Sequence, residues 1–175
     1  IFRAKGPIKN NNLEKKLAIN KLKVINFPIL KIEEIKTKYK VNKFVKAALV
    51  TSLFGFYYLS RLSVDRNIKL FLLSESSRNF ALKLGYKNII DCQGDSVKML
   101  NIIKKSIRKD EGELIYAGAK KISIDLPKLL TKCGYKINRL ILYESQYINQ
   151  FNKTFLNLIK NDQIKWIVLL SSKGA

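Results

Sequence analysis

The segment Ala47-Ala48-Leu49-Val50-Thr51-Ser52, followed by a mostly apolar run over residues 53–62, decides the fold class. Residues 47–50 are consecutive apolar side chains without polar alternation, which is typical of a strand buried on both faces. Thr51 and Ser52 then offer hydroxyl oxygens that can cap the first N–H groups of a helix. We therefore predict a buried strand over residues 47–50 and a helix over residues 53–62.

The same order of strand, cap and helix recurs along the whole chain. The further predicted strands are residues 1–4, 22–27, 68–73, 88–90, 113–116, 137–143 and 166–170. The further predicted helices are residues 11–20, 78–84, 126–133 and 146–160, and a helix opened by Asp95 and Ser96 whose apolar positions Val97, Leu100, Ile103 and Ile107 share one face. We expect Gly85 and Gly134 to stop helices, Gly118 to end a strand, and Pro28 to stop regular pairing before an extended connector.

Alternating strands and helices imply right-handed crossovers and mainly parallel sheets covered by helices, hence an α/β protein. Ligands of such folds bind beyond the carboxyl ends of the strands, where helix N-termini attract anions. Hydroxyl or glycine residues stand at these ends: Thr51, Ser52, Ser74, Ser76, Ser77, Gly118, Ser171 and Ser172. The alternative is that they serve only as helix caps. The residues alone thus favour an α/β protein that binds an anionic ligand.

Composition excludes several classes of chemistry. The chain has no His, which removes Ser-His-Asp and Cys-His catalysis and argues against a zinc site. Its two cysteines lack metal-like spacing and are interpreted as reduced structural thiols. No apolar run is long enough to span a bilayer and no signal peptide is visible, so we expect a cytoplasmic protein with no membrane partner.

The net charge of +21 has three competing explanations. Lysines spread along the whole chain, together with scarce arginine, favour the compositional bias of an AT-rich genome. An anionic substrate would also be attracted by such a field. Nucleic-acid binding is the weakest of the three, because arginine is the residue that reads bases and phosphates with a bidentate fork. We therefore expect no nucleic-acid partner.

The ordered set of motifs resembles uroporphyrinogen-III synthase. Its motifs are Phe2-Arg3-Ala4, the segment over residues 27–32, the strand end Thr51-Ser52, Leu73-Ser74-Glu75-Ser76-Ser77 with Gly85-Tyr86, Tyr116-Ala117-Gly118, Gly134-Tyr135, Leu142-Tyr143-Glu144, and the segment over residues 168–172. The departures are Ser74 in place of Gly, Ser77 in place of Thr, Ala117 where Arg is common and Lys173 where Pro is common. Members of the family are expected to continue beyond the position that corresponds to Ala175.

The resemblance implies two α/β domains with mainly parallel sheets flanked by helices, joined by a two-stranded linker. Residues 1–33 with 145–175 would form the first domain, which lacks its C-terminal part, and residues 37–140 the second. Residues 28–36 and 141–146 would be the linkers, paired antiparallel. The implied activity is the closure of hydroxymethylbilane to uroporphyrinogen III, with ring D inverted through a spiro-pyrrolenine, by a monomer without a cofactor. Hydroxymethylbilane synthase would be a transient partner.

Within that resemblance Tyr143 is the candidate catalytic residue, since a phenol that is protonated at neutral pH can donate to the departing hydroxyl. Its alternative role is that of a structural linker residue. The candidate substrate-binding residues are Arg3, Thr51, Ser52, Ser74, Ser76, Ser77, Gly118, Ser171, Ser172 and Lys173. The alternative function is that of a non-catalytic flavodoxin-like binding or regulatory module for an acidic partner.

Overall fold

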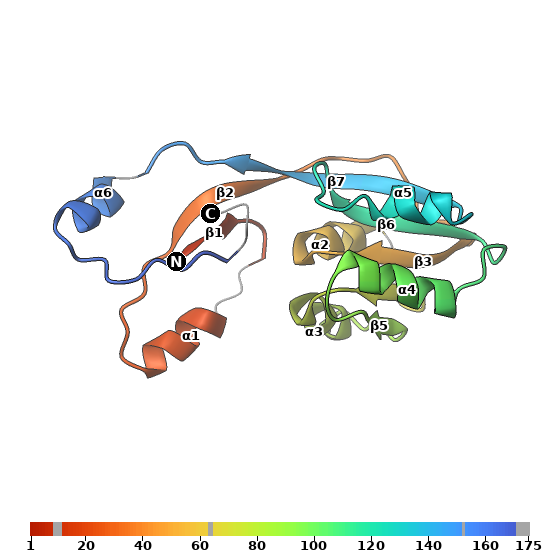
Figure 1. Cartoon of the computed structure of the whole chain (residues 1–175), viewed down its shortest axis with the longest axis horizontal. Coiled ribbons are helices and arrows are strands. Elements are labelled where there is room, and N and C mark those ends of the chain that lie inside the picture. The colour runs from red at the N-terminus through yellow and green to blue at the C-terminus, as the bar shows by residue number, and fades with distance from the viewer. Residues whose placement is uncertain (9–11, 63–64, 152, 171–175) are drawn as a thin grey trace. The chain divides into compact units, whose positions relative to one another are not determined.

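The chain is represented by a computed structural model that describes residues 1–8, 12–62, 65–151 and 153–170 (Figure 1). The chain divides into two compact units. Unit 1 comprises Ile1–Glu33 and Ser145–Ala175, and unit 2 comprises Glu34–Glu144. Each unit is described by itself below.

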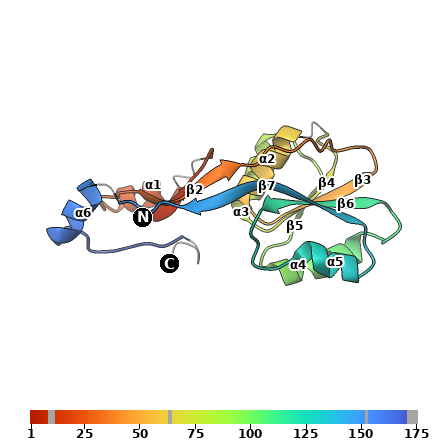
Figure 2. The same ribbon diagram turned by 90° about the horizontal axis from the view of Figure 1, so that it is seen from above.

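Unit 2 is a parallel sheet with helices on both faces. Its elements are β3 (Val45–Val50), α2 (Leu53–Leu62), β4 (Lys69–Leu72), α3 (Glu75–Lys83), β5 (Ile89–Asp91), α4 (Ser96–Ser106), β6 (Glu113–Ala119), α5 (Leu126–Lys132) and β7 (Ile137–Tyr147), which continues past Glu144 into unit 1. The strands follow the order β7-β6-β3-β4-β5, and each neighbouring pair is parallel. Helix α2 lies on one face and α4 and α5 on the other (Figure 2). The predicted α/β class, with a mainly parallel sheet flanked by helices, is confirmed.

The core of unit 2 is built around β3, as the opening segment predicts. Ala47, Ala48, Leu49 and Val50 are all fully buried. Continuous burial is the consequence of placing the strand between β4 and β6 with helices on both sides. On one of these faces, α4 and α5 contribute Met99, Ile103, Leu126 and Leu130 to a single apolar cluster.

The predicted helix caps and helix stops of unit 2 are confirmed. The Ser52 hydroxyl accepts from the Gly55 N–H at 3.0 Å, and Ser74 and Asp125 cap α3 and α5 in the same way. Asp95 accepts from the N–H groups of Val97 and Lys98. Gly85 and Gly134 have φ of 79° and 88°, the left-handed region in which glycine avoids a Cβ clash.

Two predictions in unit 2 are wrong in detail. Strand β6 runs to Ala119, so Gly118 lies inside it, because the pairing with β7 continues through both residues. On α4 the buried positions are Met99 and Ile103, whereas Val97 is 50% exposed.

Unit 1 is smaller and less regular. It holds β1 (Phe2–Lys5), α1 (Asn12–Ile19), β2 (Phe27–Glu34), of which Glu34 already belongs to unit 2, and α6 (Lys153–Lys160). Strands β1 and β2 are parallel, and their register shifts between Arg3 and Ala4, beside the partner position of Pro28. Pro28 therefore lies within a strand instead of ending one, because an irregular register accommodates its missing N–H.

Three further predictions in unit 1 are wrong. Residues 22–26 form no strand, and pairing starts only at Phe27. Helix α6 starts at Lys153 and not at residue 146, because β7 continues to Tyr147 and the Ile148 N–H donates to the Ile29 carbonyl at 2.9 Å. Residues 166–170 make only an isolated bridge between Phe2 and Leu169, since β1 offers a short edge.

Residues in or next to the predicted linkers form hydrogen bonds within each unit. In unit 2 the Ile35 N–H donates to the Leu142 carbonyl at 2.8 Å, and in unit 1 the Ile148 N–H bonds to the Ile29 carbonyl. From Ile29 to Ile35 the residue numbers rise along one segment, while those of their partners fall from Ile148 to Leu142 along the other. This is the pattern of an antiparallel pair. The role of residues 28–36 and 141–146 as interdomain linkers stays a prediction.

Candidate functional site

The carboxyl edge of the sheet in unit 2 gathers most of the predicted site residues. Val50 pairs with Leu72 on one side and with Ala117 on the other, so Thr51, Ser52 and Ser74 follow neighbouring strand ends. The candidate site residues at or just beyond this edge are Thr51, Ser52, Ser74, Ser76, Ser77, Gly118 and Tyr143. Here the backbone N–H groups that open α2 and α3 carry positive partial charge.

Tyr143 and Ser52 form a hydrogen-bonded pair at this edge. Their hydroxyl oxygens lie 2.9 Å apart, and the Ser52 oxygen also accepts from the Gly55 N–H that opens α2. Tyr143 is 6% exposed. Burial raises the pKa of Tyr143 above its ordinary value, and the hydrogen bond to Ser52 offsets that rise in part. The phenol therefore stays protonated at neutral pH and can act as a hydrogen-bond donor.

An irregularity in the sheet orients Tyr143. Gly118 pairs with Ile141, but Ala119 pairs with Tyr143, so β7 carries one extra residue at this point. An extra residue reverses which face the following side chains occupy. Tyr143 accordingly packs beside Phe54 and Tyr58 of α2, with ring centroids 6.1 Å away in both cases. The bulge thus brings the phenol to the N-terminus of α2.

A second phenol reaches the same edge from the opposite face. Tyr116 belongs to the apolar cluster of α4 and α5, and its hydroxyl lies 2.9 Å from the Thr51 hydroxyl. Burial raises the pKa of Tyr116, while the bond to Thr51 and the nearby Arg139 lower it. Sequence reasoning missed this residue, although its place two positions before Gly118 was a usable signal.

The three serines after β4 hydrogen-bond to one another. The Ser74 hydroxyl lies 2.7 Å from that of Ser77 and 3.2 Å from that of Ser76, and it also accepts from the Ser77 N–H. Ser77 is fully buried. A group of hydroxyls at the start of a helix can hold a carboxylate, but Ser74 also serves as the helix cap.

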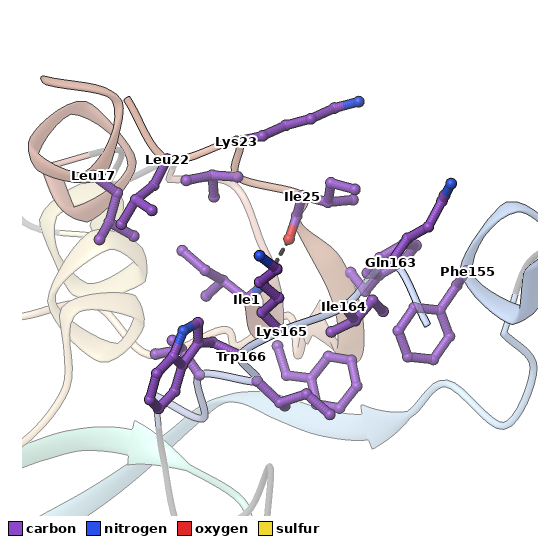
Figure 3. Close-up of a pocket in the computed structure, with 15 residues that line it drawn as sticks. Ile1, Leu17, Leu22, Lys23, Ile25, Phe155, Gln163, Ile164, Lys165 and Trp166 are labelled. Carbon is purple, nitrogen blue, oxygen red and sulfur yellow. Dashed lines mark hydrogen bonds between the residues drawn. The ribbon is translucent and has the colours of Figure 1, made fainter. Parts of the chain in front are cut away.

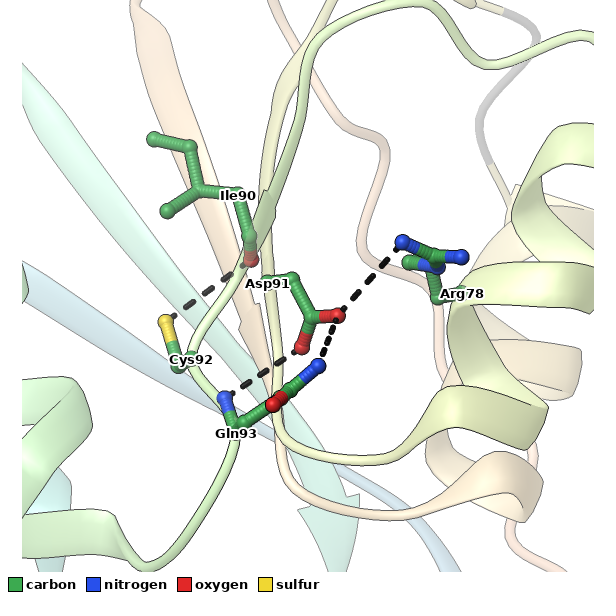
Figure 4. Close-up of polar contacts among 5 residues, drawn as sticks. All are labelled: Arg78, Ile90, Asp91, Cys92 and Gln93. Carbon is green, nitrogen blue, oxygen red and sulfur yellow. Dashed lines mark hydrogen bonds and ion pairs between the residues drawn. The ribbon is translucent and has the colours of Figure 1, made fainter.

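Two arginines near this edge also escaped the sequence analysis. Arg78, in the first turn of α3, lies 3.8 Å from the Asp91 carboxylate, which also accepts from the Gln93 backbone and side chain at 3.2 Å (Figure 4). The Arg78 side chain is 44% exposed, so its guanidinium remains open to an anion. Arg139 donates to the carbonyls of Ala119 and Lys120 and so caps the end of β6.

Cys92, beside Asp91, is a buried free thiol whose Sγ donates to the Ile90 carbonyl at 3.7 Å (Figure 4). Burial is the main cause that raises the pKa of Cys92 to about 11. Such a thiol is a poor nucleophile at neutral pH. Cys133 is also free. Among the described residues, no group of His, Cys, Asp and Glu side chains could hold a metal ion, and no helix could span a membrane.

The candidate site residues of unit 1 are less informative. Arg3 forms an ion pair with Glu14, so a substrate carboxylate would compete with that partner for the guanidinium. Ser171, Ser172 and Lys173 lie outside the described residues. Unit 1 also contains a pocket of about 550 Å³ (Figure 3). Its lining is mainly apolar, with Ile1, Leu22 and Trp166 among the lining residues, so the pocket does not suit a polyanion.

Comparisons with known proteins identify a matching family and similar solved structures. The family described as uroporphyrinogen-III synthase HemD matches residues 11–175. The fold is similar to that of uroporphyrinogen-III synthetase from Helicobacter pylori, with a TM-score of 0.52 and 15% identity over 75% of this chain and 60% of that one. It is also similar to a mutant uroporphyrinogen III synthase from the extremely thermophilic bacterium Thermus thermophilus, with a TM-score of 0.52 and 16% identity over 85% of this chain and 64% of that one. The chain thus spans less than two thirds of either structure. No curated protein matches the sequence.

Proposed function

This chain belongs to the uroporphyrinogen-III synthase family, and we propose that it closes hydroxymethylbilane to uroporphyrinogen III with inversion of ring D. The observation that carries the proposal is the Ser52–Tyr143 pair at the carboxyl edge of unit 2. This edge combines a protonated phenol, a helix N-terminus and neighbouring hydroxyls. The phenol can donate a proton to the hydroxyl of hydroxymethylbilane, and the other groups can bind its carboxylate arms.

Tyr143 is proposed to protonate the departing hydroxyl of the substrate. When Ser52 donates to the phenol oxygen, the Tyr143 proton is left free for the substrate. The Gly55 N–H supports the Ser52 oxygen from behind. As the proton leaves, negative charge develops on the phenol oxygen near the N-terminus of α2, whose dipole stabilises it. The products of this step would be water and the azafulvenium cation, whose charge balances the phenolate. Transfer of the pyrrole N–H proton to the phenolate would then restore Tyr143 and give the neutral electrophilic azafulvene.

The remaining task is restraint of a flexible chain of pyrroles. Ring closure without inversion occurs spontaneously, so the enzyme must favour attack by the substituted carbon and formation of the spiro-pyrrolenine. Holding the acetate and propionate arms supplies that orientation. Thr51 and the Ser74–Ser76–Ser77 cluster are the proposed ligands in unit 2, with Arg78 as an additional cation. The net charge of +21 would speed the encounter with such a substrate.

The wider context is proposed with the same function. Residues 28–36 and 141–146 would link two domains, Arg3, Ser171, Ser172 and Lys173 would add contacts from the first domain, and Gly118 would offer backbone to the substrate. The enzyme would act as a cytoplasmic monomer without a cofactor, and it would meet hydroxymethylbilane synthase transiently.

The test is an isomer assay with hydroxymethylbilane. The products are oxidised, and the ratio of inverted to uninverted isomer is measured against a reaction without protein. We expect the inverted isomer to dominate and Tyr143→Phe to lower turnover by about 10- to 1,000-fold. The matched control is Tyr135→Phe, which also removes a buried hydroxyl from unit 2 but one that donates to the Ile107 carbonyl. A product ratio equal to that of the protein-free reaction would leave the non-catalytic binding module as the better interpretation.

A further inference from the structure

We infer that Tyr116 is a positioning residue, which holds the Thr51 hydroxyl at the end of β3 so that its proton faces a carboxylate arm of the substrate. The inference rests on the proposed function and adds a residue to its site. The motif set contains Tyr116 but gives its side chain no role, and the role inferred here follows from its contacts.

The first observation is that a core residue reaches the edge of the sheet. Tyr116 is 2% exposed and packs in the cluster that contains Met99, Ile103 and Leu126. Its hydroxyl nevertheless ends 2.9 Å from the Thr51 hydroxyl, on the residue that follows β3. A phenol held by close packing loses little entropy when it forms this bond, so it fixes its partner effectively.

The second observation concerns the glycine two positions along β6. A Cβ at Gly118 would come within 2.8 Å of the Tyr116 Cε1 and 3.2 Å of its hydroxyl oxygen. A glycine is therefore required here because the ring of Tyr116 occupies the space that a side chain would fill. Gly118 therefore leaves room for the Tyr116 ring, in addition to its predicted role of contacting the substrate through its backbone.

The third observation is chemical. A threonine hydroxyl has one proton and two acceptor sites. When the phenol donates to the Thr51 oxygen, the Thr51 proton is free to point outward from the strand end, toward an anion. Without the phenol hydroxyl, the Thr51 hydroxyl can rotate toward other partners, and its outward orientation is lost. Ser52 and Tyr143 form a second hydroxyl pair on the other face, but there the serine is the proposed donor and the phenol keeps the free proton.

The test is a double-mutant cycle with Tyr116→Phe, Thr51→Val and their combination. The ring is retained in Tyr116→Phe, so the core stays filled, and circular dichroism and urea unfolding check the fold. Loss of one hydrogen bond predicts a KM for hydroxymethylbilane that is higher by about 3- to 10-fold, with kcat changed by less than about twofold. The double variant should be no worse than Thr51→Val alone, and Thr51→Ser should stay close to the unmodified chain. Tyr135→Phe is the matched control and should leave KM unchanged.

The same cycle is measured by equilibrium titration with uroporphyrin III, which requires no turnover. A weakened affinity in Tyr116→Phe that is absent in Tyr135→Phe supports the inference. Equal affinities for Tyr116→Phe and the unmodified chain overturn it, and so do additive losses in the double variant, because Tyr116 would then act independently of Thr51. A chain that makes no excess of the inverted isomer contradicts the proposed function instead, and the titration still decides the role of Tyr116.

Discussion

The two units of this chain bury their apolar residues to very different extents. Phe27, Leu30 and Phe155 are the buried apolar residues that unit 1 contributes among those described, and the rest of the buried core lies in unit 2. Unit 1 instead exposes large apolar side chains, with Trp166 at 84% and Ile19 at 81%. Because the stability of a domain scales with the apolar surface it buries, unit 2 should be much the more stable of the two.

This difference matters for the candidate site. The Ser52–Tyr143 and Thr51–Tyr116 pairs join the end of β3 to tyrosines on strands of the well-packed unit, so their geometry is held by the core around them. Arg3, from the other unit, has Glu14 as its partner. Orientation of a flexible substrate requires rigid groups. The comparison therefore favours the candidate residues of unit 2 as the more rigidly held ones.

The strongest test of the comparison uses two Leu→Ala changes. Leu49 is fully buried on β3, whereas Leu17 lines the pocket of unit 1 and is only partly buried. Leu49→Ala should lower the free energy of unfolding by about 2–5 kcal/mol, since it leaves a cavity in a packed core. Leu17→Ala should lower it by less than about 1 kcal/mol. Urea unfolding followed by circular dichroism measures both, and equal losses would contradict the comparison.

Alkaline pH should weaken unit 2 selectively. The tyrosines whose pKa is raised, mainly by burial, all belong to it: Tyr39, Tyr58, Tyr86, Tyr116, Tyr135 and Tyr143. Above their unfolded pKa of about 10, the unfolded chain releases protons that the folded chain keeps, so stability is complete below that pH and falls as pH rises.

The free energy of unfolding should fall by up to about 1.4 kcal/mol per pH unit for each tyrosine that ionises only on unfolding. Urea midpoints are measured at steps from about pH 8 to pH 11, across the ordinary tyrosine pKa. Tyr143→Phe removes one of these groups and should give a shallower decline. A decline of unchanged steepness in that variant would show that Tyr143 contributes nothing to it.

The difference between the two units also explains which elements could be predicted from sequence. The caps Ser74, Asp95 and Asp125 act on N–H groups two or three residues away, so their signals are local and the helices of unit 2 follow from them. In unit 1, whether residues 22–26 or 166–170 form a strand depends on a partner far along the chain. Nothing in the pattern of a single segment reveals such a partner.

The candidate site shows the same limit. Thr51, Ser52 and Tyr143 could be selected from the sequence, because hydroxyls at strand ends are visible there. Their pairing could not be predicted, since the Ser52–Tyr143 contact depends on one extra residue in β7. Tyr116 was missed for a related reason. Its sequence pattern is that of an ordinary core residue of a strand. Only the register of β6 against β3 places its hydroxyl beside Thr51.

The smallest expected effect concerns Trp166, the single tryptophan of the chain. It belongs to unit 1 and is 84% exposed, beside Ile167 at 56%. Tryptophan is usually well buried in folded domains, so this exposure agrees with the small buried core described for unit 1. The acrylamide quenching constant of the folded chain should therefore lie within about twofold of that in urea, where the chain is unfolded. A strongly protected Trp166 in the folded chain would mean that unit 1 covers its apolar surface as well as unit 2 does. The stability difference between the Leu49 and Leu17 variants should then also disappear, so each measurement checks the other.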